Sequence, residues 1–161
     1  MPNLVARGGR NRHRGQSLVE FALLLPVFVL LLMGILDFAR AIYAYNAVGN
    51  AAREGTRTAI VNQNPNDISA RAATQATGLG ISTVPVSCPP AGTNGVCVQF
   101  LTSDLSATCS PAGIGCVAQV IVKYTFTPIT PIIGNIIGSI PVSSTSQQSI
   151  ESTCTGTCPI P

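Results

Sequence analysis

The feature that most constrains this chain is an uninterrupted helix-compatible stretch from residue 15 to residue 61. Its first part, residues 18–36, is almost wholly apolar and carries a single charged side chain, that of Glu20. An α-helix needs about 20 predominantly apolar residues to cross a bilayer. The stretch therefore predicts a transmembrane segment over residues 18–36.

The second part of the stretch keeps the helical period but becomes amphipathic. Apolar and small residues recur at the i, i+3, i+4, i+7 spacing of one helix face: Phe38, Ala41, Ile42, Tyr45, Val48, Ala52, Gly55 and Ala59. The predicted solvated face carries Asp37, Arg40, Asn46, Asn50, Arg53, Glu54 and Arg57, with Glu54 and Arg57 as an i, i+3 pair. Gly55, on the apolar face, would admit a closely packed strand. We predict one helix from about residue 17 to about residue 61, half in lipid and half on a soluble domain.

The charges are unevenly distributed along the chain. The net charge of +3 depends on four arginines that precede the apolar run, Arg7, Arg10, Arg12 and Arg14; without them five basic residues face six acidic ones, a balance of −1. Basic residues just before a membrane helix stay in the cytoplasm. This predicts a basic cytoplasmic leader (1–15), the long helix (16–61) and an exported domain (62–161), with no nucleic-acid surface. A cleaved signal peptide is disfavoured, because the apolar run is too long for one.

Glu20 allows two interpretations. Ser17 and Glu20 have the spacing of a capping box at a helix start. Alternatively, a carboxylate at membrane depth calls for a partner, because it is costly there unpaired. The basic leader that ends at Gly15, five residues before Glu20, resembles the processing site of type IV pilins. That resemblance implies that a prepilin peptidase cuts between Gly15 and Gln16, and that Glu20 pairs with the new amine of a neighbouring subunit.

The resemblance extends over residues 14–59 and is to the TadE-like proteins of tight-adherence pilus systems. It rests on Gly15 followed by Gln16-Ser17-Leu18-Val19-Glu20-Phe21, on Pro26 within the apolar run, on Asp37-Phe38-Ala39-Arg40, and on Ala51-Ala52-Arg53-Glu54-Gly55-Thr56-Arg57. It implies a pseudopilin or minor pilin that assembles in the membrane with other pilin-like subunits. Two alternatives stay open: an uncleaved single-pass anchor that displays an extracytoplasmic binding domain, and an accessory protein of pilus assembly that does not enter the filament.

The remaining chain predicts a small antiparallel sheet. Pro65 ends the long helix, and residues 67–77 form a second helix capped by Asn66 or Asp67 and stopped by Gly78. Strands are expected at 81–87, 96–101, 117–126 and 140–150, and residues 129–138 form an apolar connection near the membrane surface. We expect an α+β, pilin-like fold in which the sheet packs on the exported half of the long helix.

Six cysteines follow the apolar run, on the side that the arginines predict to be exported: Cys88, Cys97, Cys109, Cys116, Cys154 and Cys158. Such surroundings favour disulfides, and we predict the local pairs Cys88–Cys97, Cys109–Cys116 and Cys154–Cys158. The cysteines lack C-x-x-C spacing and the only histidine is His13 in the leader, so we expect no metal, no cofactor and no catalytic base. We therefore expect a non-enzyme without a small-molecule substrate.

Overall fold

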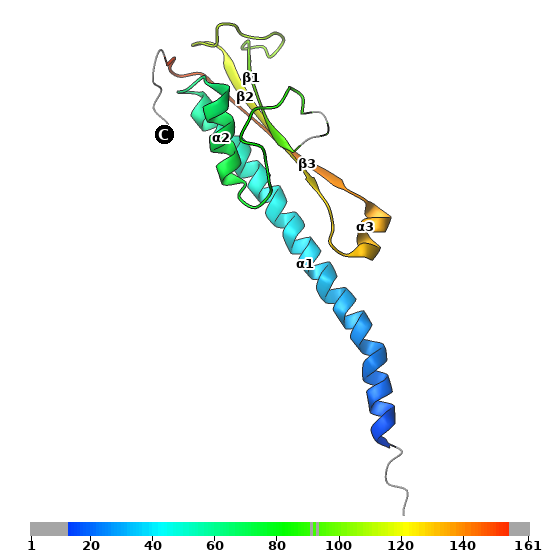
Figure 1. Cartoon of the computed structure of the whole chain (residues 1–161). Coiled ribbons are helices and arrows are strands. Elements are labelled where there is room, and N and C mark those ends of the chain that lie inside the picture. Colours follow the sequence, from blue (N-terminus) through cyan, green and yellow to red (C-terminus); the bar gives the residue numbers. More distant parts are fainter. Residues whose placement is uncertain (1–12, 91, 93, 155–161) are drawn as a thin grey trace, which may run out of the picture.

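The computed structural model describes residues 13–90, 92 and 94–154 of the chain. Three helices and one sheet follow in the order α1 (His13–Ala59), α2 (Pro65–Gln75), β1 (Gly95–Leu101), β2 (Val117–Phe126), α3 (Pro131–Ile137) and β3 (Ile140–Ser149). The strands pair antiparallel in the order β1-β2-β3. The first half of α1 projects away from the sheet, and its second half packs on the sheet together with α2 (Figure 1). The predicted α+β class, a long helix with a small antiparallel sheet, is confirmed.

Helix α1 is continuous through Pro26. It begins at His13, before the predicted start near residue 17, and ends at Ala59, two residues before the predicted end. The chain leaves the helix in a tight turn, where the Thr58 carbonyl accepts the N–H groups of Val61 and Asn62. Of the predicted leader, residues 1–12 lie outside the described residues, and residues 13–15 belong to α1.

The core lies between the second half of α1, helix α2 and one face of the sheet. Strand β2 has the predicted bounds, and its residues alternate as period 2 requires: Ala118, Val120, Val122 and Phe126 are buried. Helix α1 supplies mostly small side chains to this core, and a Cβ added to Gly55 would lie 2.9 Å from Val120 Cγ1 and 3.1 Å from Ala72 Cβ. The predicted close approach of a strand at Gly55 is thus confirmed.

The prediction of which face of α1 is buried is wrong for residues 38–45, the first two turns after the apolar run. Phe38 and Tyr45 are 68% and 70% exposed, and Ile42 is exposed as well. The residues that pack inward there are Asp37 and Ala44, followed by Ala47, Val48 and Ala51. The side chains of α1 that pack inward are thus mostly small, and the large ones point outward.

Helix α2 begins two residues earlier than predicted, and the predicted caps Asn66 and Asp67 are wrong. The cap is Asn64, whose side-chain oxygen accepts the Asn66 N–H at 3.1 Å. Pro65 then occupies the first turn, where its missing N–H costs nothing and its fixed φ suits the helix. Pro65 therefore starts the second helix, although it was expected only to end the first.

Two further segments differ from the prediction. Residues 81–87 are not a strand: Val86 donates one hydrogen bond to Val96 O at 2.9 Å, but Pro85 has no N–H and Ser82 bonds locally to Val84. Residues 129–138 contain the short helix α3, which begins at Pro131.

Disulfides join Cys88 to Cys97 and Cys109 to Cys116, two of the three local pairs predicted. The first links the loop before β1 to β1 itself, and the second closes the loop between β1 and β2. The third pair includes Cys158, which lies outside the described residues, and stays a prediction.

The close contact at Gly55 predicts a specific cost for Gly55→Ala. The added methyl would press on Val120 and Ala72, both buried, so we expect a loss of about 1–3 kcal/mol of unfolding free energy. Gly49→Ala is the matched control in the same helix, because a Cβ there meets nothing within 4 Å. It should be neutral or stabilising by about 0.5–1 kcal/mol. Urea unfolding of both variants in detergent measures the difference, and equal effects would contradict the packing argument.

Candidate functional site

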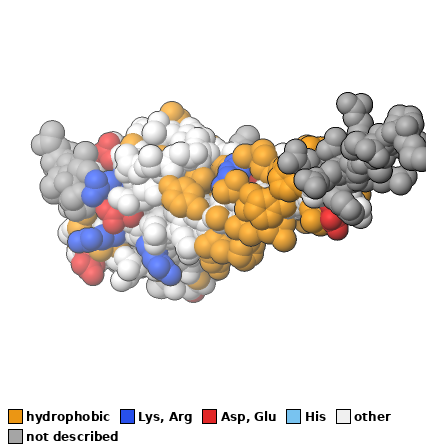
Figure 2. All heavy atoms as spheres, turned by 90° about the horizontal axis from the view of Figure 1, so that it is seen from below, with side chains coloured by type: hydrophobic (Ala, Val, Ile, Leu, Met, Phe, Trp, Pro, Cys, Tyr) orange, Lys and Arg blue, Asp and Glu red, His pale blue; other side chains and the backbone are white. Residues whose placement is uncertain are grey.

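The first half of α1 has an extended apolar outer surface. Its large apolar side chains all lie exposed, among them Leu18, Phe21, Leu24, Phe28, Leu31 and Ile35. Within the described residues, α1 is the one helix long and apolar enough to cross a membrane, and its apolar window has no share buried inside the protein. Figure 2 shows a broad patch of hydrophobic side chains, with most charged side chains gathered at the domain end. A core helix of a soluble protein would be covered, so this surface fits a single-pass membrane protein.

The predicted processing residues lie in the first turns of α1. Gly15 and Gln16 are helical, and a Cβ added to Gly15 would meet nothing within 4 Å. Glu20 and Phe21 are exposed on the same helix, one turn further along. The structure therefore brings Gly15, Gln16, Glu20 and Phe21 together at one end of α1, and places Pro26 about one and a half turns beyond them.

The capping-box interpretation of Ser17 and Glu20 is wrong in this structure. A capping box requires the serine to be the residue just before the first helical turn. Helix α1 begins at His13, so Ser17 and Glu20 are interior helix residues. Among the described residues no ion pair or hydrogen bond involves the Glu20 carboxylate. Its role is therefore not to close the start of the helix.

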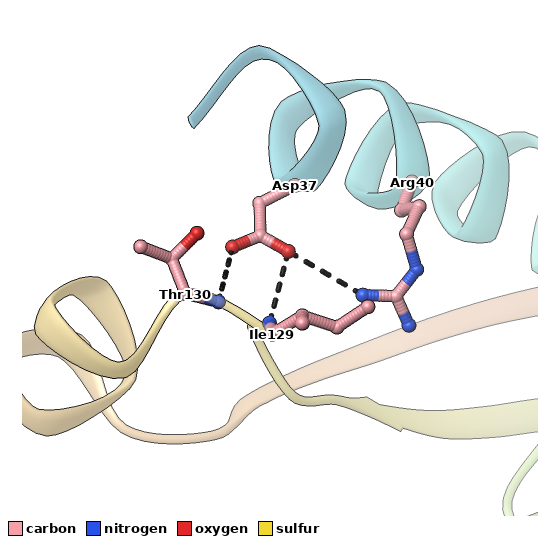
Figure 3. Close-up of polar contacts among 4 residues, drawn as sticks. All are labelled: Asp37, Arg40, Ile129 and Thr130. Atoms are coloured by element: carbon pink, nitrogen blue, oxygen red, sulfur yellow. Dashed lines mark hydrogen bonds and ion pairs between the residues drawn. The ribbon is translucent and has the colours of Figure 1, made fainter. Parts of the chain in front are cut away.

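At the other end of the apolar run, Asp37 connects α1 to the segment after β2 (Figure 3). Its Oδ1 accepts the Ile129 N–H and its Oδ2 accepts the Thr130 N–H, both at 2.9 Å. These two bonds, which we call the Asp37 clamp, span more than 90 residues of sequence, and Asp37 is 6% exposed. The predicted solvated position of Asp37 is wrong, because these N–H groups lie after the strand and need an acceptor.

Arg40 supports the same junction. Its Nη1 lies 3.4 Å from Asp37 Oδ1, and its guanidinium carbon lies 5.5 Å from the centre of the Phe126 ring at the end of β2. The neighbouring Thr130 hydroxyl, although its oxygen has no hydrogen-bond partner among the described residues, and the N–H groups of Ile129 and Thr130 lower the pKa of Asp37 from 3.8 to about 2. A lowered pKa means that the clamp contributes fully above the ordinary carboxyl range and weakens only as the pH falls from 3.8 toward 2.

Arg53 and Arg57 are exposed and Glu54 is half-buried, but Glu54 and Arg57 do not pair as predicted. Glu54 pairs with Arg71 of α2, with Nε and Oε1 3.1 Å apart, and not with Arg57. Arg71 reaches Glu54 because α2 packs along α1, whereas Arg53 and Arg57 are exposed. Among the described residues no group of three His, Cys, Asp or Glu side chains is placed to hold a metal ion.

Sequence reasoning missed the Asp37 clamp. The sequence feature that could have indicated the clamp is a carboxylate directly after the apolar run, where the run gives way to the amphipathic half of the helix. The helical period assigned Asp37 to the polar face, and nothing local identified its partners at Ile129 and Thr130.

The opening segment of the chain matches a known protein family. Residues 15–57 match the model of the TadE-like protein family, which confirms the resemblance drawn from the sequence. The family is one of Tad pilus-associated structural proteins. The match begins at Gly15 and ends two residues before the end of α1, so it includes the apolar run and the clamp residue Asp37. No curated protein and no solved structure matches the chain.

The Asp37 clamp predicts that Asp37→Ala loosens the segment after β2 while the sheet stays folded. Without the carboxylate, the N–H groups of Ile129 and Thr130 lose their charged hydrogen-bond acceptor. Their hydrogen exchange should therefore accelerate by roughly tenfold or more. Asp104→Ala is the control, because Asp104 bonds only to Thr102 and Ser106 in an exposed loop. Hydrogen exchange of both variants, measured by mass spectrometry, should be faster at residues 129–130 in Asp37→Ala only. Unchanged exchange at these residues in Asp37→Ala would contradict the clamp.

Proposed function

We propose that this protein is a pseudopilin or minor pilin of a Tad pilus. Residues 18–36 hold it in the cytoplasmic membrane, a prepilin peptidase trims it between Gly15 and Gln16, and α1 assembles laterally with other pilin-like subunits. The observation that carries the proposal is the fully exposed apolar half of α1, continuous with a helix half that is built into the domain. One helix thereby offers a surface for lipid or neighbouring helices and holds the exported domain on it.

Gly15 supports the processing step. Glycine inside a helix is about 1 kcal/mol less favourable than alanine, and a packing reason usually accompanies it. At Gly15 there is open space where a Cβ would be, so no contact with the described residues requires glycine. A requirement imposed by a peptidase that must approach the backbone closely accounts for it.

Glu20 supports the assembly step. It is the only charged residue between positions 18 and 36, and a carboxylate in that position is costly in lipid unless it is paired. The described residues provide it with no ion-pair partner. The amine released at Gln16 of an adjacent subunit would neutralise it, and the fixed offset between the two groups would set the register of neighbouring helices.

The first test is the N-terminus of the native protein. Mass spectrometry of membrane and sheared-surface fractions should find chains that start at Gln16, and Gly15→Val should accumulate as the uncut form because its side chain obstructs the peptidase. Ser17→Ala, two residues beyond the cut, is the matched control and should be trimmed normally. A wild-type chain that retains Arg7 to Arg14 in every fraction would favour the uncleaved anchor.

The second test separates assembly from processing. Glu20→Gln keeps the size of the side chain and removes its charge, so the protein should be trimmed and inserted normally but lose most of its co-purification with sheared filaments. Glu20→Asp, which keeps the charge on a shorter side chain, should retain part of it. Trimmed wild-type protein that never co-purifies with filaments would favour the accessory role.

A further inference from the structure

Residues 129–140, which follow β2 and end at the first residue of β3, expose apolar side chains at the sheet end that faces the projecting half of α1 (Figure 1). Ile136 is 78% exposed, and Ile129, Ile137 and Ile140 are exposed as well. No charged residue occurs between Lys123 and Glu151. Scattered surface isoleucines need no explanation, but a charge-free cluster of four marks a contact surface.

The height of this isoleucine segment relative to the membrane helix is fixed. The Asp37 clamp holds residues 129 and 130 at the first residue beyond the apolar run. Further along the segment, Ile133 Cδ1 lies 4.0 Å from where a Cβ on Gly34 would be. Gly34 is inside the run, about 4.5 Å nearer the membrane centre than Asp37 at about 1.5 Å per residue. The segment therefore reaches below the end of the transmembrane stretch.

Between the segment and α1 lies an open apolar hollow of about 210 Å³. Its lining includes Gly34, Phe38, Phe126, Pro128, Ile137 and Ile140. The hollow continues directly from the lipid-facing surface of α1, and Asp37, whose carboxylate is engaged in the clamp, is the only charged residue of its lining. Its occupant must therefore be apolar and must lie at the level of the membrane boundary.

We propose that the isoleucine segment is a second membrane contact, which inserts into the acyl-chain boundary of the leaflet facing the exported domain. Elements that lie in this interface bury their apolar side chains about 5–10 Å deep, and Ile133 beside Gly34, about 4.5 Å below Asp37, lies just short of that depth. The proposal rests on the anchoring of α1 in the membrane, proposed above, and is independent of filament assembly. The lipid contact seats the domain directly on the bilayer and, through the Asp37 clamp, holds it at one height.

The chain contains no tryptophan, so a single introduced tryptophan reports its own surroundings. The test places Ile136→Trp in the full-length protein, reconstituted into phosphatidylcholine vesicles whose acyl chains carry bromine either near the headgroups or deep. Leu25→Trp, in the middle of the apolar run, is the control for anchoring. Ile114→Trp, 75% exposed in the loop at the opposite end of the sheet, is the control for water.

We expect shallow bromines to quench Ile136→Trp several-fold more strongly than Ile114→Trp, and deep bromines to quench mainly Leu25→Trp. If Leu25→Trp is quenched but Ile136→Trp behaves as Ile114→Trp does, the lipid contact is wrong while the anchoring stands. If Leu25→Trp is not quenched, the anchoring itself fails and the lipid contact fails with it. If Ile136→Trp is shielded only at high protein density and is not quenched by bromine, a neighbouring chain covers the segment and the proposal is overturned. Ile137→Trp repeats the test at the adjacent exposed position.

Discussion

The structure depends on one constraint, which is that a single continuous helix must provide both an exposed apolar surface and a face on which a sheet packs. Over residues 18–36 the helix has a wide, largely exposed apolar surface that the domain approaches at Gly34. From Asp37 onward it has a face of small side chains that lets a sheet approach closely. The change falls within a turn or two and without a break in the helix. The rest of the domain follows from this change: β2 packs at Gly55, α2 lies against the same stretch, and β3 returns along it.

Within that arrangement, specificity comes from a few polar contacts on an otherwise small and apolar core. The Asp37 clamp ties the membrane-proximal end of the sheet to the helix, and the ion pair between Glu54 and Arg71 ties α2 to it further along. Tyr43 adds a bond from its hydroxyl to the Thr77 carbonyl at 2.7 Å, beyond the end of α2. A helix face of alanines alone could slide along a sheet, whereas these bonds are satisfied in only one register.

The parts that the sequence predicted are those with a strong local period. Strand β2 alternates over its whole length and its bounds match, and the long helix has no internal stop strong enough to end it. The prediction of the buried face of α1 was wrong because it followed hydrophobicity and placed Phe38 and Tyr45 inside. The α1 side chains that pack on the sheet are instead mostly small. The predicted exposure of Asp37 was wrong because its hydrogen-bond partners lie more than 90 residues away in the sequence. Such distant partners leave no periodic pattern near Asp37. At the N-terminal end, the functional roles of Gly15 and Glu20 stay predictions: among the described residues Glu20 has no ion-pair partner, and a Cβ on Gly15 would meet nothing within 4 Å.

Because α1 is continuous, the number of residues between Glu20 and Asp37 sets both the distance of the domain from Glu20 and its rotation about the helix axis. Since the helix runs unbroken from Glu20 to Asp37, the azimuth at which the domain stands relative to Glu20 is set by residue count, at about 100° of rotation for each residue. One residue added between them would lift the domain by only about 1.5 Å but would swing it through more than a quarter turn. In the assembly proposed above, the length of the apolar run would therefore act as an angular setting as much as a match to membrane thickness, and it would fix which side of the domain each neighbour meets.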